Sequence, residues 1–272
     1  MSITVRTDIE QGSEEWLDAR RGMVTASIVG QLVSVESADP LSVFCPVCHA
    51  QEGDPCLSSA RKEPTPIKTP HGVRAAVAAE QPPVYKPATT DTAKSLTALL
   101  VAERITGWSD PIFISQDMWR GKLDEPLARD LYSKTYAPVT EAGIIIRDDW
   151  GFELGYSPDG LVGEDGLIEI KSRRSKRQVT TIVGDDVPPE VMPQIQCGLL
   201  VSGRRWCDYV SYCGGMPMWV KRVYPDLAWQ AGIIEAAHAF EASAARMIAA
   251  YQEAVVGLPM TERIDHFAEI EE

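Results

Sequence analysis

Apolar residues recur along the chain with two different periods, which predict alternating blocks of helix and strand. Residues 13–34 are predicted to form two short helices, with S-E-E-W starting the first. Further helices are predicted over 92–106, 116–134 and 189–202, and strands near 143–148, 152–157, 166–171, 206–212 and 217–223. This order predicts an α/β fold in which helices flank a central mixed sheet.

The C-terminal stretch 226–256 is predicted to be one long helix. Its apolar stripe is expected to pack on its own domain rather than to form a coiled coil between subunits. The stripe consists of Ile233, Ala237, Phe240, Ala244, Met247 and Tyr251. The stretch 80–91 is too rich in proline for a helix and is interpreted as a linker. We expect a single domain over 1–272, interrupted by an insert at 41–80.

The segment L-I-E-I-K, residues 167–171, places two charges in an otherwise apolar strand. Side chains alternate faces along a strand, so Glu169 and Lys171 share one face while Ile168 and Ile170 take the other. Buried charge is costly unless it is paired or coordinates a metal. Together with Asp159 in the preceding S-P-D-G turn, the pair could be a plain salt bridge or the core of a catalytic site.

The catalytic interpretation rests on the chemistry of these groups. Carboxylates are oxygen ligands suited to Mg²⁺ or Mn²⁺. Such an ion polarises a phosphoryl oxygen and lowers the pKa of a bound water. A lysine on the same face can orient or deprotonate that water and offset charge in the transition state. The set is therefore suited to hydrolysis of phosphodiesters.

Further motifs surround this segment in a fixed order. They are G-S-E-E-W-L-D-A-R-R-G-M-V-T-A-S near the N-terminus, G-K-L-D-E-P-L-A at 121–128, Y-S-P-D-G-L, I-E-I-K, and M-P-Q-I-Q at 192–196. Together they resemble the lambda-exonuclease or YqaJ family of phage recombination nucleases, within the PD-(D/E)xK superfamily. The resemblance runs from about residue 10 to about 224 and implies a restriction-endonuclease-like fold.

The resemblance implies roles for individual side chains. Asp159 and Glu169 match the principal Mg²⁺ ligands and Lys171 the catalytic lysine. The other matches are Glu125 to a helix-borne acid near the metals, Gln194 to the glutamine that places the attacking water, Arg20 to an arginine that grips the terminal phosphate, and Ser27 to a hydroxyl near that phosphate. Pro126 follows Glu125 directly, so Glu125 is expected at a helix start or a kink.

Each of these residues also has a structural interpretation. Arg20 could pack its stem on Trp16 one helical turn away. Ser27 could be a polar residue at a helix start, and Gln194 a solvated helix residue. Asp159 could be a turn aspartate before Gly160.

The insert at 41–80 carries its own chemistry. Cys45 and Cys48 in C-P-V-C, followed by Cys56 and His71, make a Cys3His set suited to tetrahedral Zn²⁺. His49 is a competing fourth ligand, and a flexible loop with free thiols is the alternative. The segment has too few large apolar residues to fold around its own core, so a metal would supply the missing stability. It also resembles small zinc-binding modules with C-P-x-C and a late H-x-x-R found in actinobacterial and phage proteins.

Charge and composition adjust this interpretation. The net charge of −13 argues superficially against DNA binding, but basic residues cluster at 20–21, 171–177 and 204–205. The chain contains no apolar run long enough to span a membrane and no signal-peptide pattern, so we expect a cytoplasmic protein, in the host cytoplasm if phage-encoded. Six cysteines in such a chain suggest metal binding or plain thiols before disulfides.

The leading hypothesis is a Mg²⁺-dependent exonuclease that resects double-stranded DNA ends for recombination. The family resemblance implies 5′-to-3′ polarity, a ring-shaped homotrimer and a single-strand-annealing recombinase as partner. The alternatives are a PD-(D/E)xK endonuclease or a RecB-like host repair nuclease. A further alternative is a catalytically inactive DNA-binding scaffold with a zinc recruitment module.

Overall fold

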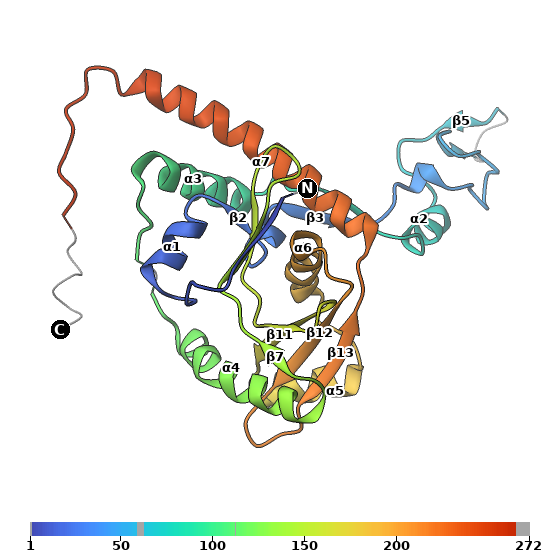
Figure 1. Ribbon diagram of the computed structural model, residues 1–272. Coiled ribbons are helices and arrows are strands. Elements are labelled where there is room, and N and C mark those ends of the chain that lie inside the picture. The colour runs from blue at the N-terminus through green and yellow to red at the C-terminus, as the bar shows by residue number, and fades with distance from the viewer. Residues whose placement is uncertain (1, 59–62, 112, 265–272) are drawn as a thin grey trace.

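The computed structural model describes residues 2–58, 63–111 and 113–264, and it confirms the mixed α/β class (Figure 1). Its central five-stranded sheet is mixed. β11 and β12 run parallel, and the other neighbours run antiparallel. In sheet order the strands are β13 (Trp219–Val223), β12 (Trp206–Tyr212), β11 (Gly166–Ser172), β10 (Gly160–Val162) and β7 (Val139–Thr140).

A second sheet has four strands, and the apolar pattern predicted neither of its edge strands. One of them is β1 (Ile3–Arg6). Its side chains are mostly exposed, so its sequence carries little of the apolar signal that marks a buried strand. The remaining strands, in sheet order from β1, are β8 (Ile144–Arg147), β9 (Leu154–Tyr156) and β2 (Val24–Thr25).

The helices cover the sheets from several sides (Figure 1). In the described ranges the α-helices outside the insert are α1 (Glu14–Arg20), α3 (Asp91–Thr106), α4 (Gln116–Thr135), α5 (Ser175–Gly184), α6 (Met192–Ser202) and α7 (Leu227–Ala254), with short 3-10 turns at Val29–Gln31 and Pro189–Val191. None of the described helices is long and apolar enough to cross a lipid bilayer.

The two faces of β11 pack against different helices. Ile168 and Ile170 join a buried cluster with Ala128 and Tyr132 of α4. Leu167, one residue away, belongs to the larger core that includes α6 and α7. The alternation predicted from L-I-E-I-K therefore holds, and it turns Glu169 and Lys171 toward the side of α6.

The predicted second helix within 13–34 is wrong. Gly22 follows α1 with a left-handed φ of 68°, and the chain then enters β2, which pairs with β9. The stretch 80–91 is not purely a linker, because it contains β6 (Val84–Pro87), paired with β3 (Val33–Glu36). β2 and β6 are short, and each pairs with a strand that is distant in the sequence. The local periodicity of apolar residues carries no information about such pairing.

The β3–β6 pair brackets the insert and anchors it to α7. Tyr85 packs on Trp229 with ring centroids 4.1 Å apart. A Cβ on Gly232 would lie 2.4 Å from the Cβ of Tyr85, so α7 needs glycine there to approach the strand. Beyond the β3–β6 pair the insert extends away from the rest of the molecule (Figure 1). It contains a 3-10 turn at Pro40–Ser42, β4 (Leu57–Ser58), β5 (Thr65–Pro66) and α2 (Gly72–Ala79).

The first four of the six residues in the apolar stripe of α7 are buried, and the last two are exposed. Ile233, Ala237, Phe240 and Ala244 lie in the main core. Tyr251, nearer the C-terminal end, is 44% exposed. The helix thus packs on its own chain for about two thirds of its length, up to Ala244, and its last turns are more exposed.

Candidate active site

Strand β11 presents the central charged pair. The Glu169 side chain is fully buried, and Lys171 donates from Nζ to its Oε1 at 2.7 Å. Lys171 also donates to Gln194 Oε1 on α6 at 2.9 Å. Tyr156 donates from its hydroxyl to Glu169 Oε2 at 3.4 Å. The salt bridge suggested by the sequence therefore exists, and it forms part of a wider polar network.

Asp159 lies between β9 and β10, directly against this pair. Its Oδ2 accepts a hydrogen bond from the backbone N–H of Ile170 at 2.6 Å. Burial raises its pKa well above the usual range, and repulsion from Glu169 and Glu125 raises it further. The three carboxylates thus interact with one another at a buried site.

Glu125 occupies the interior of α4 instead of a helix start, with Pro126 accommodated inside the helix. It pairs with Arg129 one turn later. Arg129 also donates from Nε to the backbone oxygen of Asp159 at 2.7 Å and pairs with Glu141 at 2.8 Å. Sequence reasoning missed Arg129, although the four-residue spacing from Glu125 was a visible signal.

The acidic set suits a divalent cation. Burial raises the pKa of Glu125, and repulsion from Glu169 and Glu141 raises it further. The neighbouring charge of Arg129 lowers it but does not outweigh these effects. A hard cation would relieve this repulsion, because carboxylates are its preferred ligands. Among the described residues, a group in the insert also brings metal-ligating atoms within 4.8 Å of one another.

A small cavity of about 160 Å³ adjoins Asp159. It brings together residues from α1, β2, β9 and α6 that are far apart in the sequence. Its lining comprises Gln11, Trp16, Arg20, Thr25, Ala26, Ser27, Tyr156, Ser157, Asp159 and Gln194. Four of the residues singled out from the sequence, namely Arg20, Ser27, Asp159 and Gln194, therefore share one concave surface.

Arg20 is held in place from two sides. Its guanidinium stacks over the Trp16 ring, 4.1 Å from the ring centroid, so the predicted packing on Trp16 is present. The same group donates to Thr25 Oγ1 at 3.1 Å and to Ser27 Oγ at 3.2 Å. Burial lowers the pKa of Arg20, and no ion pair joins this arginine to a described carboxylate within 4.0 Å. This partly desolvated cation faces the cavity with two hydroxyl groups beside it.

A larger cavity of about 800 Å³ shares Gln11 and Trp16 with the small one. Lys122, Glu125 and Arg129 of α4 line it. Glu125 therefore lines the larger cavity and Asp159 lines the smaller one. Trp16 lines both cavities.

The basic run after β11 is largely occupied within the protein. Arg173 donates to the Tyr209 hydroxyl at 2.9 Å. Arg174 pairs with Asp117, and Arg177 with Glu190. The last two arginines are about two-thirds exposed in their pairs. Exposed ion pairs of this kind contribute little to stability, so these two arginines are only weakly held by their carboxylate partners.

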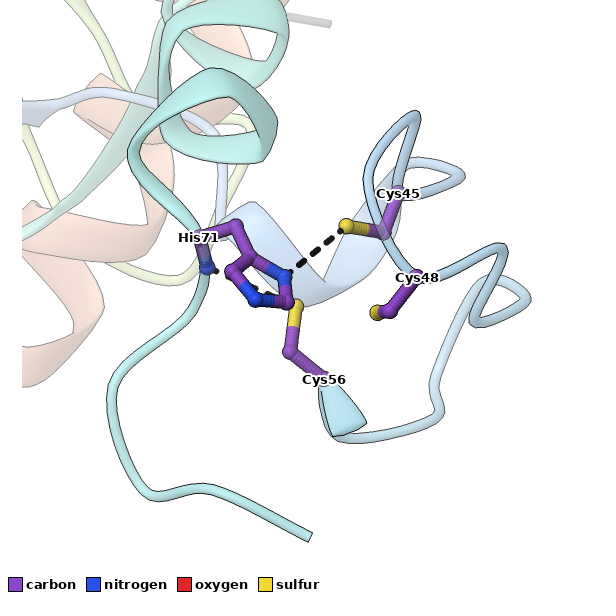
Figure 2. A group of neighbouring side chains, drawn as sticks. All are labelled: Cys45, Cys48, Cys56 and His71. Carbon is purple, nitrogen blue, oxygen red and sulfur yellow. Dashed lines mark hydrogen bonds between the residues drawn. The ribbon is translucent and has the colours of Figure 1, made fainter. Parts of the chain in front are cut away.

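The insert gathers a second candidate site. Cys45, Cys48, Cys56 and His71 point toward one another (Figure 2), with one ligand atom from each lying within 4.8 Å of the others. Cys45 Sγ lies 3.4 Å from His71 Nδ1. His49 is not a member of this group; it takes a left-handed φ of 58° in the turn after Cys48.

Hydrogen bonds favour the thiolate form of Cys48 and Cys56 in this cluster. Burial opposes ionisation of Cys56, but donors that include the His71 backbone N–H and Arg74 outweigh it and lower its pKa to about 6. A hydrogen bond from the Leu57 backbone N–H lowers the pKa of Cys48. Burial raises the pKa of Cys45. Three sulfurs and an imidazole at this spacing suit a tetrahedral metal.

Comparison with known proteins gives matches to a family model and to solved structures. A family model described as the YqaJ-like viral recombinase domain matches residues 15–205, which is more than half of the chain. The chain is similar to the crystal structure of an alkaline exonuclease, LHK-Exo, from Laribacter hongkongensis, with 28% identity, a TM-score of 0.65, and coverage of 91% of this chain and 100% of that one. It is also similar to LHK-Exo in complex with dAMP, with 27% identity and the same TM-score and coverage. No protein with curated annotation matches it.

Proposed function

The chain belongs to the YqaJ-like viral recombinase family and is a nuclease, and on this premise we propose a specific activity. It is a Mg²⁺- or Mn²⁺-dependent 5′-to-3′ exonuclease that resects double-stranded DNA ends in the cytoplasm for recombination by single-strand annealing. The observation that carries the proposal is the contact of Lys171 with both Glu169 and Gln194, next to a cavity lined by Asp159 and Arg20.

The side chains of this site have different proposed roles. Asp159 and Glu169 would hold the cation, with Glu125 beside them. The bound ion would polarise the scissile phosphate and acidify a water. Burial disfavours the charged form of Lys171, but Glu169 and Asp159 outweigh that effect and raise its pKa. Lys171 therefore acts as an ammonium that orients water and offsets developing charge, and Gln194 fixes the direction of its N–H groups.

Arg20 and Ser27 would receive the 5′-terminal phosphate in the small cavity. A guanidinium can contact two phosphate oxygens at once, and the hydroxyl supplies a further donor. Because Asp159 lines the same cavity, a strand end held there would place its adjoining phosphodiester beside the acids. This arrangement favours an enzyme that starts at ends.

Assembly and partners form a further part of the proposal. The family resemblance favours a homotrimer and a single-strand-annealing recombinase as partner. The outer face of α4 supports contact with another chain, because Leu123 and Leu127 are each 56% exposed and Trp119 is 54% exposed. Apolar residues grouped on one surface often mark a protein interface.

The activity is tested with end-labelled linear duplex and closed circular duplex, each with and without Mg²⁺. An exonuclease digests the linear DNA only, and only with the metal. Cleavage of the circle would instead favour an endonuclease. Binding to DNA without cleavage under any metal condition would favour the inactive scaffold.

Arg129 is expected to position Glu125 and the Asp159 backbone for the cation. Arg129→Gln should raise the Mg²⁺ concentration needed for half-maximal cleavage by about ten- to a hundredfold, because partners that orient metal ligands have effects of this size. Arg129→Lys keeps the charge and should shift the midpoint less. The measurement is a Mg²⁺ titration of the cleavage rate at saturating DNA. An unchanged midpoint in Arg129→Gln would leave Arg129 without a role at the metal.

We propose that residues 1–272 act as one exonuclease domain and that 41–80 is a structural zinc insert within it. Its buried cluster consists of Cys45, Ala50 and Cys56, with Cys48 and Ile67 against it, which is too little apolar surface to stabilise a fold alone. The donor set and its spacing fit Zn²⁺ better than a hard cation.

Purified protein is expected to contain about one zinc per chain, the stoichiometry of a closed four-ligand site. Replacing Cys45 and Cys48 with serine should remove this zinc and increase protease cleavage within 41–80. Elemental analysis and limited proteolysis measure the two effects. Metal-free wild type, purified without chelators, would refute the zinc site and leave the nuclease proposal intact.

A further inference from the structure

Arg74 is a fully buried arginine at the centre of the insert. It lies on α2, three residues after His71, and its side chain has no solvent exposure. Its guanidinium donates to Cys56 Sγ at 3.4 Å. The other acceptors are four backbone oxygens, those of Leu41, Val43, Gln51 and Asp54, at 2.7–3.2 Å.

These contacts join every segment that carries a ligand. The Val43 oxygen precedes the Cys45–Cys48 turn, and the Gln51 and Asp54 oxygens lie in the loop that leads to Cys56. Arg74 itself is on the helix that His71 precedes. A single planar group therefore fixes the three segments relative to one another.

Among the described residues, the charge of Arg74 has no carboxylate partner. No ion pair within 4.0 Å joins it to a described acid, although many exposed cations of this chain have one. Backbone oxygens satisfy its N–H groups but carry no net charge. Since a buried unpaired cation is costly, a compensating negative charge is expected close by, and Cys56 is the ionisable group that Arg74 contacts.

The metal–thiolate centre that the four ligands would form with a divalent cation supplies that negative charge. Zn²⁺ with three thiolates and a neutral imidazole carries a net charge of −1, and Arg74 brings the buried total to zero. We propose that Arg74 is the counter-charge of this site, positioning Cys56 and balancing the net negative charge of the set when it holds a divalent, thiophilic cation. This inference rests on the zinc site proposed above.

A purely structural Arg74 would behave differently from a counter-charge. If its role were only to fill space and bond carbonyls, any replacement that shortens its reach would be equally harmful. If its charge is required, a lysine should preserve much of the metal affinity, and a neutral glutamine should not. Both replacements are shorter than arginine, glutamine by one atom more than lysine, and both can donate hydrogen bonds.

The test measures zinc affinity of the full chain by competition with a chromophoric chelator, starting with the wild type. Arg74→Gln is expected to bind zinc about ten- to a hundredfold more weakly, and Arg74→Lys to lose clearly less. Lys68→Gln removes an exposed cation of the same insert and should leave affinity unchanged.

Equal losses in the lysine and glutamine variants, including complete loss in both, would overturn the counter-charge role while the wild-type zinc site stands. A wild type that binds no zinc would instead overturn the zinc proposal itself. The two failures are therefore distinguishable in one experiment.

Discussion

Glu169→Gln is expected to slow digestion of linear duplex DNA by about a thousandfold, corresponding to several kcal/mol of lost charge stabilisation by the metal. Glutamine keeps the shape of the side chain and can still contact Lys171 and Tyr156, so the fold should persist. What disappears is a negative ligand at a fully buried position. Initial rates at saturating Mg²⁺ and DNA measure the effect, and thermal unfolding checks the fold.

Lys171→Ala is the companion variant. Removing the ammonium should lower turnover by about a hundred- to ten-thousandfold while DNA affinity changes little. Removing Lys171 also leaves the buried carboxylate of Glu169 without its ion-pair partner, so a lower melting temperature is expected as well. Rates are therefore expressed per folded molecule. Near wild-type rates in both variants would reduce the Glu169–Lys171 pair to a structural salt bridge.

The sequence predicted correctly that Glu169 and Lys171 share one face of a strand, because that information is local. In L-I-E-I-K a two-residue period fixes which side chains share a face, and β11 has that alternation. The Cys3His spacing was similarly informative, since C-x2-C with a later cysteine and histidine constrains a small loop. Both inferences needed only neighbouring residues.

Strand pairs and hydrogen bonds between residues that are distant in the sequence could not be predicted from local patterns. β1 pairs with β8, some 140 residues further along the chain, and β2 pairs with β9. The bond from Arg129 to the Asp159 backbone oxygen joins α4 to a turn thirty residues away. Arg74 was visible only as part of H-x-x-R, and its burial among four carbonyls comes from the way the insert folds.

Arg20 offers the second test of large expected effect, because it separates recognition of an end from cleavage. A terminal 5′-phosphate carries more negative charge than an internal one. The guanidinium of Arg20 faces the cavity beside Ser27 and is fixed by stacking on Trp16. Wild type is therefore expected to prefer 5′-phosphorylated over 5′-hydroxyl duplex ends.

Arg20→Ala should remove most of that preference. Loss of a charged hydrogen bond of this kind weakens end engagement by roughly 1.5–3 kcal/mol, or about ten- to a hundredfold. The maximal cleavage rate at saturating DNA should change much less, since Arg20 does not contact Glu169 or Lys171. The measurement compares kcat/KM for the two kinds of end, in the variant and in wild type.

Arg21→Ala is the matched control, because Arg21 adjoins the same helix end but pairs with Asp18 and does not line the cavity. It should retain the wild-type preference. Arg20→Lys is a more stringent test, because lysine keeps the positive charge but lacks the planar guanidinium that can contact two phosphate oxygens. This variant should therefore retain only part of the preference for 5′-phosphorylated ends. A wild type indifferent to the 5′-phosphate, or an Arg20→Ala variant with undiminished preference, would make Arg20 a structural partner of Trp16 and would place the strand end elsewhere.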